Sequence, residues 1–215
     1  MTINVKDGDK KVEIISAVLL SIVIISTAWC AYQSTLWSGI MTFRLGEVNA
    51  NTQKYVMSTI QQSQYSTVDV ITFMEYINAL NSNDEKRTQF FFERFREDFK
   101  PAVEAWLKTN PLENPDAPSH PLMMPEYKKT FSEDAEKFAE QSAIKLNEAS
   151  QANKNSDNYI LLTVIYASVL FLSGVLSKFP GLKVRTSLLT IGIIIYVITT
   201  IGLFSLPLAP ELIID

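Results

Sequence analysis

Hydrophobic positions along this chain gather in three long runs, at residues 12–34, 158–177 and 186–206. The runs are free of charged residues from Ile14 to Tyr32, from Tyr159 to Leu176 and from Leu188 to Leu206. Each is close to the ~20 residues that an α-helix needs to cross a bilayer. The pattern predicts an all-α protein with three transmembrane helices, and a helical extracytoplasmic stalk domain (35–157) between the first and second.

Basic residues near the membrane ends predict the orientation. Outside residues 38–157, all the lysines and arginines lie in the tail 1–11 and the loop 178–185. The tail 207–215 holds none. Lysine and arginine accumulate on the cytoplasmic side, and three spans place that tail and loop on the same side. We therefore expect a multi-pass protein with its N-terminus inside. The large domain and the C-terminus, which carries Glu211 and Asp215, should lie outside.

Helical spacing continues beyond the first run. No proline occurs before Pro101, so the first membrane helix can extend into water. The cluster Asn81–Asp84 predicts a turn with Asp84 as the next N-cap. A helix from Glu85 to about Lys108 should follow, kinked or restarted at Pro101. Apolar residues recur at helical spacing in both helices. The stripe in the first is diluted by polar residues and consists of Val56, Ile60, Thr67, Ile71 and Met74. The stripe in the second is stronger and consists of Phe92, Phe95, Phe99, Ala102 and Trp106.

A proline-dense connector follows at residues 110–121. Its composition predicts an extended, stiff segment. From about Glu126 a last helix, with aromatic and small residues on one side, should run without a breaker into the second span. Together these helices are expected to form a stalk standing on the membrane.

The net charge of −4 is concentrated in the middle of the chain, because residues 38–157 hold 13 of the 19 basic and 18 of the 23 acidic residues. A mildly acidic domain repels phosphate backbones, so nucleic acid is not an expected partner. The single cysteine, Cys30, lies inside the first run and is interpreted as a small buried side chain.

One aromatic group stands out at the outer end of the first run: Trp29, Tyr32, Gln33 and Trp37. Trp29, Gln33 and Trp37 are spaced four residues apart and should share a helix face. Three interpretations stay open. The group can be an aromatic belt at the membrane interface, a helix-packing seam in which Gln33 bonds across an assembly, or a ligand site.

Signals for catalysis are lacking. No phosphate-binding glycine loop, metal-spaced His/Cys cluster or nucleophile elbow occurs, and no ionisable residue lies deep in a span. The charges at residues 93–98 are interpreted as a solvated, salt-bridged helix face. His120 with Met123 and Met124 is a weak pattern for copper. We expect no enzyme activity, no cofactor, no metal and no small-molecule substrate.

Several segments together resemble a family of small uncharacterised bacterial three-span inner-membrane proteins with no known activity. They are TAWCAYQSTLWSG (27–39), FFFERFR (90–96), PAVEAWL (101–107), NPLENPDAP (110–118) and MPEY (124–127). Family members have Ser-Gly where Cys30 and Ala31 stand here, which weakens any role for Cys30. The resemblance implies the bacterial cytoplasmic (inner) membrane and no chemistry.

The expected function is that of a non-enzymatic interaction, assembly or accessory subunit in the lipid bilayer. Its contact residues are predicted in and beside the connector: Trp106, Asn110, Pro111, Asn114, Pro115, Asp116, Met123 and Met124. We also expect a homo-oligomer packed along the first helix, or a place in a larger membrane complex. The alternative is a channel or transporter subunit formed by oligomerisation and lined by Thr163, Ser168, Ser173, Thr190, Thr199 and Thr200.

Overall fold

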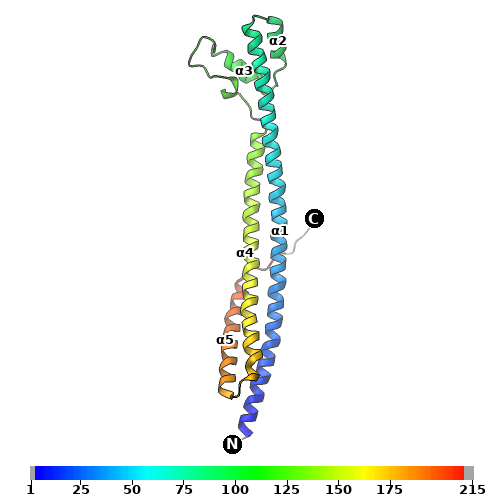
Figure 1. Cartoon of the computed structure of the whole chain (residues 1–215), viewed down its shortest axis with the longest axis vertical. Helices are drawn as coiled ribbons and strands as arrows, with labels where there is room; N and C mark the ends of the chain where they lie inside the picture. The colour runs from blue at the N-terminus through cyan, green and yellow to red at the C-terminus, as the bar shows by residue number, and fades with distance from the viewer. Residues whose placement is uncertain (1–2, 211–215) are drawn as a thin grey trace. The chain divides into compact units, whose positions relative to one another are not determined.

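The computed structural model describes residues 3–210, with side chains from Gly8 onward, and contains only helices and loops in that range. The predicted all-α fold class is confirmed. Residues 1–2 and 211–215, including Glu211 and Asp215 of the predicted acidic tail, lie outside the described residues. The elements in chain order are α1 (Ile3–Asn81), α2 (Glu85–Glu93), α3 (Lys100–Leu107), η1 (Pro121–Met123), α4 (Ser132–Val175), η2 (Leu176–Lys178) and α5 (Leu182–Ser205) (Figure 1).

The chain divides into two compact units. Unit 1 comprises the residues up to Glu47 and those from Ile144 onward, and unit 2 comprises Val48–Ala143. Both boundaries fall inside long helices, so α1 and α4 each contribute to both units.

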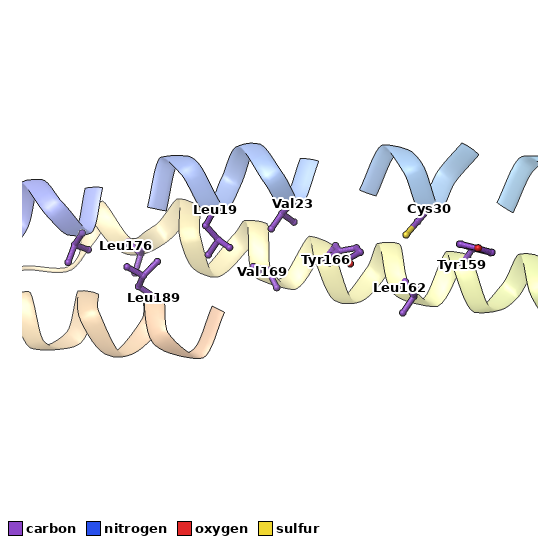
Figure 2. Packing of buried hydrophobic residues seen from close by; sticks show 10 residues of the cluster. Leu19, Val23, Cys30, Tyr159, Leu162, Tyr166, Val169, Leu176 and Leu189 are labelled. Carbon is purple, nitrogen blue, oxygen red and sulfur yellow. The ribbon is translucent and has the colours of Figure 1, made fainter. Parts of the chain in front are cut away.

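Unit 1 is a three-helix packing of α1, α4 and α5. Figure 2 shows side chains of α1 meeting those of α4, with Leu189 of α5 packing beside Leu176. The buried positions recur every three or four residues along α1 and α4, which is the spacing of helices packed at a shallow angle. Ser16, Ser34 and Ser156 are also buried, and small side chains of this kind let helices approach closely. The cluster consists of Val12, Leu19, Val23, Cys30, Tyr159, Leu162, Tyr166, Val169, Leu176 and Leu189.

The apolar runs expose most of their side chains. In the most hydrophobic windows of α1, of α4 with η2, and of α5, only 22%, 22% and 17% of the residues are buried. All three helices are long and apolar enough to cross a membrane. Exposing so much apolar surface to water is unfavourable by about 25 cal/mol for each Å², whereas lipid tails solvate it. The fold is therefore that of a multi-pass membrane protein.

Unit 2 begins with α1 from Val48 to Asn81, and a tight reversal follows the helix. Asn83 has a φ of 51°, a left-handed conformation that asparagine tolerates better than most residues. The Asp84 carboxylate then accepts a hydrogen bond from the Arg87 N–H at 3.1 Å. This is the N-cap geometry of α2, so the predicted cap is confirmed.

The helix predicted from Glu85 to about Lys108 is interrupted in its middle, so the prediction is wrong there. α2 ends at Glu93, and α3 begins only at Lys100. The proline acts as a helix start, because Pro101 lies in the first turn of α3, where its missing N–H is not needed. The intervening turns let Phe95 and Phe99 pack inward. Four members of the predicted stripe are therefore buried, and Phe92 is half-buried.

The last helix also begins later than predicted, at Ser132 rather than near Glu126. Tyr127 is buried in the same aromatic cluster as Phe99, Phe73 and Tyr76. This contact holds residues 126–131 against the end of α1, and they do not form a helix.

The rest of this chain does not cover the apolar stripe of α1 in unit 2. Val56, Ile60, Ile71 and Met74 are all exposed. The inward side instead carries mainly polar residues before the aromatic cluster begins at Phe73: Ser58 and Asp69 are buried, and Gln62 and Ser66 are half-buried. Apolar periodicity identified a real stripe but could not tell which side of the helix the rest of the chain covers.

Candidate interaction site

An aromatic core supports the part of unit 2 formed by residues 69–131, called the head below. The rings of Phe73 and Trp106 meet edge to face at 5.1 Å, and the ring of Phe99 meets that of Tyr127 at 5.7 Å. Such pairs contribute about 0.5–1.5 kcal/mol each beyond their burial. The core joins α1, the 94–99 turns, α3 and the segment before α4.

A buried ion pair ties the same segments together. Asp69 of α1 is 2% exposed. The Arg96 guanidinium donates from Nε to Asp69 Oδ1 at 3.1 Å and from Nη2 to Oδ2 at 2.8 Å. Tyr127 Oη donates to the same Oδ2 at 3.1 Å. The fork of Arg96 matches the carboxylate in the bidentate geometry that is strongest for this pair.

Further hydrogen bonds continue this network. Asp98 Oδ2 accepts from Arg96 Nη1 at 3.3 Å and from Thr130 Oγ1 at 3.0 Å. Gln62 Oε1 accepts from the Phe131 N–H at 3.2 Å. The bonds from Thr130 to Asp98 and from Phe131 to Gln62 join residues far apart in the chain. The bond from Arg96 to Asp98 links the first of them to the Asp69–Arg96 pair. The network therefore fixes how the segment 124–131 lies on α1.

The interpretation of residues 93–98 as a solvated helix face is wrong for Arg96. These residues leave the helix after Glu93, and Arg96 turns onto Asp69. The sequence held one clue, since Asp69 interrupts an otherwise uncharged stretch from Tyr55 to Met74. A single sequence could not identify its partner 27 residues away.

The network also perturbs ionisation. The hydrogen bond to Asp69 raises the pKa of the Arg96 guanidinium above its ordinary value. Burial raises the pKa of Tyr127, so the phenol keeps its proton and its donor role. Both groups thus hold the protonation states that the hydrogen bonds to Asp69 require.

The connector is folded rather than extended, which corrects the prediction. Asn110 takes a left-handed φ of 50°, and its carbonyl accepts from the N–H groups of Glu113 and Asn114. Asn114 Oδ1 accepts from the Asp116 N–H at 3.0 Å, and the Trp106 indole donates to the Pro118 carbonyl at 2.6 Å. Asparagine turns and one tryptophan anchor therefore override the extended tendency of the prolines.

A cleft of about 220 Å³ opens between this connector and the end of α1. Its lining is mainly apolar, with a polar rim from Asn110 and Glu113. Leu112 is 67% exposed at its edge. The remaining lining residues are Ile77, Leu80, Trp106, Leu107 and Pro111.

The structure separates the predicted contact residues into groups. Trp106 is buried in the core, where it serves the head and one wall of the cleft. Met124 and Pro111 are half-buried, and Met123 is 61% exposed. The others are exposed on the turns: Asn110, Asn114, Pro115 and Asp116. Leu112 was missed, although a leucine between proline and glutamate in a polar loop is itself a signal.

The members of the aromatic group in unit 1 differ in exposure. Trp29 and Tyr32 are exposed and their rings lie 5.9 Å apart. Gln33 is 3% exposed and accepts from the Ala209 N–H at 2.9 Å. Trp37 donates from Nε1 to the Pro207 carbonyl at 3.2 Å. Gln33 thus finds its partner in the segment after α5 of its own chain.

Most hydroxyls named for a channel lining bond to their own helix. Ser168, Thr190 and Thr199 donate to the carbonyl four residues earlier, and Thr163 donates to Ile160. Thr200 meets Tyr166 Oη at 3.0 Å within unit 1. Ser173 is buried. These contacts give the channel alternative no specific support.

Among the side chains described, those of residues 8–210, no group of three or more His, Cys, Asp or Glu is arranged to hold a metal ion. Comparisons of the chain with protein-family models, with curated proteins and with solved structures found no match. The resemblance carried by the motifs therefore stays a prediction.

Proposed function

We propose that this protein is a non-enzymatic, membrane-anchored interaction subunit, acting in assembly or as an accessory component through the head of unit 2. The observation that carries the proposal is the cleft beside Trp106, with Leu112 exposed at its edge. Exposed apolar side chains on a well-braced support are typical of protein contact sites. The Asp69–Arg96 pair and the aromatic core supply that support.

We further propose the bacterial cytoplasmic membrane as the location, with the N-terminus inside and residues 35–157 and the C-terminus outside. Arg185, near the start of α5, pairs with Asp9 at 3.0 Å and with Glu13 at 2.9 Å. The N-terminal segment and the α4–α5 loop therefore lie at one end of unit 1. Lys10, Lys11 and the lysines of that loop add positive charge there, which favours the cytoplasmic side.

The test is quantitative affinity purification from native membranes. Leu112→Glu places a charge at the cleft edge and should remove the specific partner from the purified set by roughly tenfold or more, as for a contact worth ~1.4 kcal/mol. Phe90→Glu is the matched control, because Phe90 is also exposed and its neighbour Arg94 can pair with the new carboxylate.

Partner recovery that is equal for Leu112→Glu and wild type would contradict the proposal. Solute flux through liposomes containing only this protein would favour the channel alternative instead. Circular dichroism of both variants checks that neither result reflects unfolding.

A further inference from the structure

The side of α1 that faces away from the rest of unit 2 carries a second, uncovered stripe. Its members follow alternating steps of three and four residues, and we call them the outer seam: Ala50, Gln53, Met57, Ile60, Gln64, Thr67, Ile71 and Met74. The side chains of all eight residues are exposed. Met57, Ile71 and Met74 are 60%, 58% and 59% exposed.

The spacing of the outer seam is that of a coiled coil. Steps of three and four repeat every seven residues and keep one stripe facing a partner helix over the whole length. From Ala50 to Met74 the pattern covers about three and a half heptads, or roughly 37 Å of helix. Val56 and Val68, also exposed, flank the stripe and widen it.

Charge excludes many other occupants. Between Tyr55 and Met74 the only charged residue is Asp69, which is buried against Arg96. At the margins, Lys54 lies over the Phe138 ring at 5.5 Å and Glu75 pairs with Arg87 at 2.9 Å. A strongly charged partner would find nothing to pair with along the stripe. An identical neutral stripe meets no like-charge repulsion.

We infer that the outer seam binds the outer seam of a second copy of this chain, as a parallel two-stranded coiled coil. This inference rests on the proposed membrane anchoring, which gives both copies one direction and one height. Each seam residue then meets its own equivalent, and at Gln64 each amide can donate to and accept from the other. A polar residue at one such position favours the in-register pairing.

Anchoring in one membrane also makes pairing of two such seams more favourable. A seam of this length with glutamine, alanine and threonine positions is weak for helices free in solution. Two chains held in the same bilayer pair at a much higher effective concentration than free ones. The second copy therefore needs no large interface beyond the seam.

The test is disulfide trapping of the full chain in native membranes, in a Cys30→Ala background. Single cysteines at Gln64 and Ile71 occupy positions that face their equivalents in a parallel coiled coil, within the Cα distance a disulfide requires. Thr59→Cys is the matched control, exposed on another side of α1. Mild oxidation should give roughly tenfold more linked dimer at the two seam positions than at the control.

A second substitution perturbs the same contact, with the Gln64→Cys crosslink as the measure of dimer. Ile71→Lys places equal charges opposite each other and should abolish the dimer formed by Gln64→Cys, whereas Thr59→Lys should leave it intact. Chains with two different tags, expressed together, identify the linked species as two copies of this protein.

Three results would overturn the inference: no linked dimer at either seam position, equal yields at Thr59 and the seam, or seam cysteines linked to a different protein. The outcome is separable from that of the proposed function. Loss of the dimer with retention of the Leu112-dependent partner refutes only the seam. A seam dimer without any such partner refutes only the cleft.

Discussion

Replacing Arg96 by methionine tests the bracing of the head most severely. The substitution keeps much of the side-chain length but removes both hydrogen bonds to Asp69. The carboxylate is 2% exposed and would retain only the hydrogen bond from Tyr127. Breaking a buried ion pair from one side typically costs 3–5 kcal/mol. Because the Arg96 side chain is still 22% exposed, we take the lower end, about 3 kcal/mol.

Hydrogen exchange of the full protein in membranes or detergent measures this cost locally. A loss of about 3 kcal/mol raises the opening equilibrium by roughly 150-fold. Exchange should accelerate by that order in peptides covering residues 94–107 and 124–131. Peptides from unit 1 should be unchanged, since no member of the network belongs to it.

Two further variants separate the effect of the Arg96 charge from that of its hydrogen-bonding geometry. Arg96→Lys keeps the charge but loses the bidentate fork, so we expect an intermediate effect. The double variant Asp69→Asn with Arg96→Met should cost less than the sum of the single changes, because no buried charge is left unpaired. Exchange rates in Arg96→Met within threefold of wild type would refute the reasoning that this pair holds the head.

Three further predictions address other parts of the molecule. Burial raises the pKa of Tyr127 above its ordinary value of 10.0. The stability that the protonated phenol contributes should therefore be complete below about pH 10 and lost as the pH rises through the raised pKa. Tyr127→Phe should reduce this alkaline loss of stability in thermal melts. Gln33→Leu should remove the bond to Ala209 and speed proteolysis after Leu206 by roughly fivefold, for about 1 kcal/mol, whereas Trp29→Ala should not. Reporter fusions at residue 100 and at the C-terminus should read outside and a fusion at Gly181 inside; a cytoplasmic signal at residue 100 would overturn the orientation.

Local signals in the sequence were sufficient for much of this fold. The three apolar runs, the N-cap at Asp84 and the aromatic stripe through Phe99 each depend on residues close together in the chain. Pro101 was expected to kink or restart a helix, and it begins α3. Such features follow from backbone chemistry and periodicity, which one sequence contains.

The errors arose where distant segments compete for the same surface. An apolar stripe such as Ile60–Met74 looks the same in sequence whether this chain or another covers it. Polar residues such as Asp69 became the inward side because Arg96 and Tyr127 satisfy them. Likewise, the proline content of the connector gave no warning that Trp106 would anchor Pro118. These outcomes depend on tertiary partners, not on local propensity.

Site-specific photocrosslinking from residue 112 in native membranes shows which molecule lies against the cleft. The probe replaces Leu112 at the edge of the cleft, and a second probe replacing exposed Lys128 serves as the control. We expect one discrete adduct with a different protein from position 112 and no such adduct from position 128. Adducts only with lipid, or the same adducts from both positions, would contradict the assignment of this cleft as the interaction site.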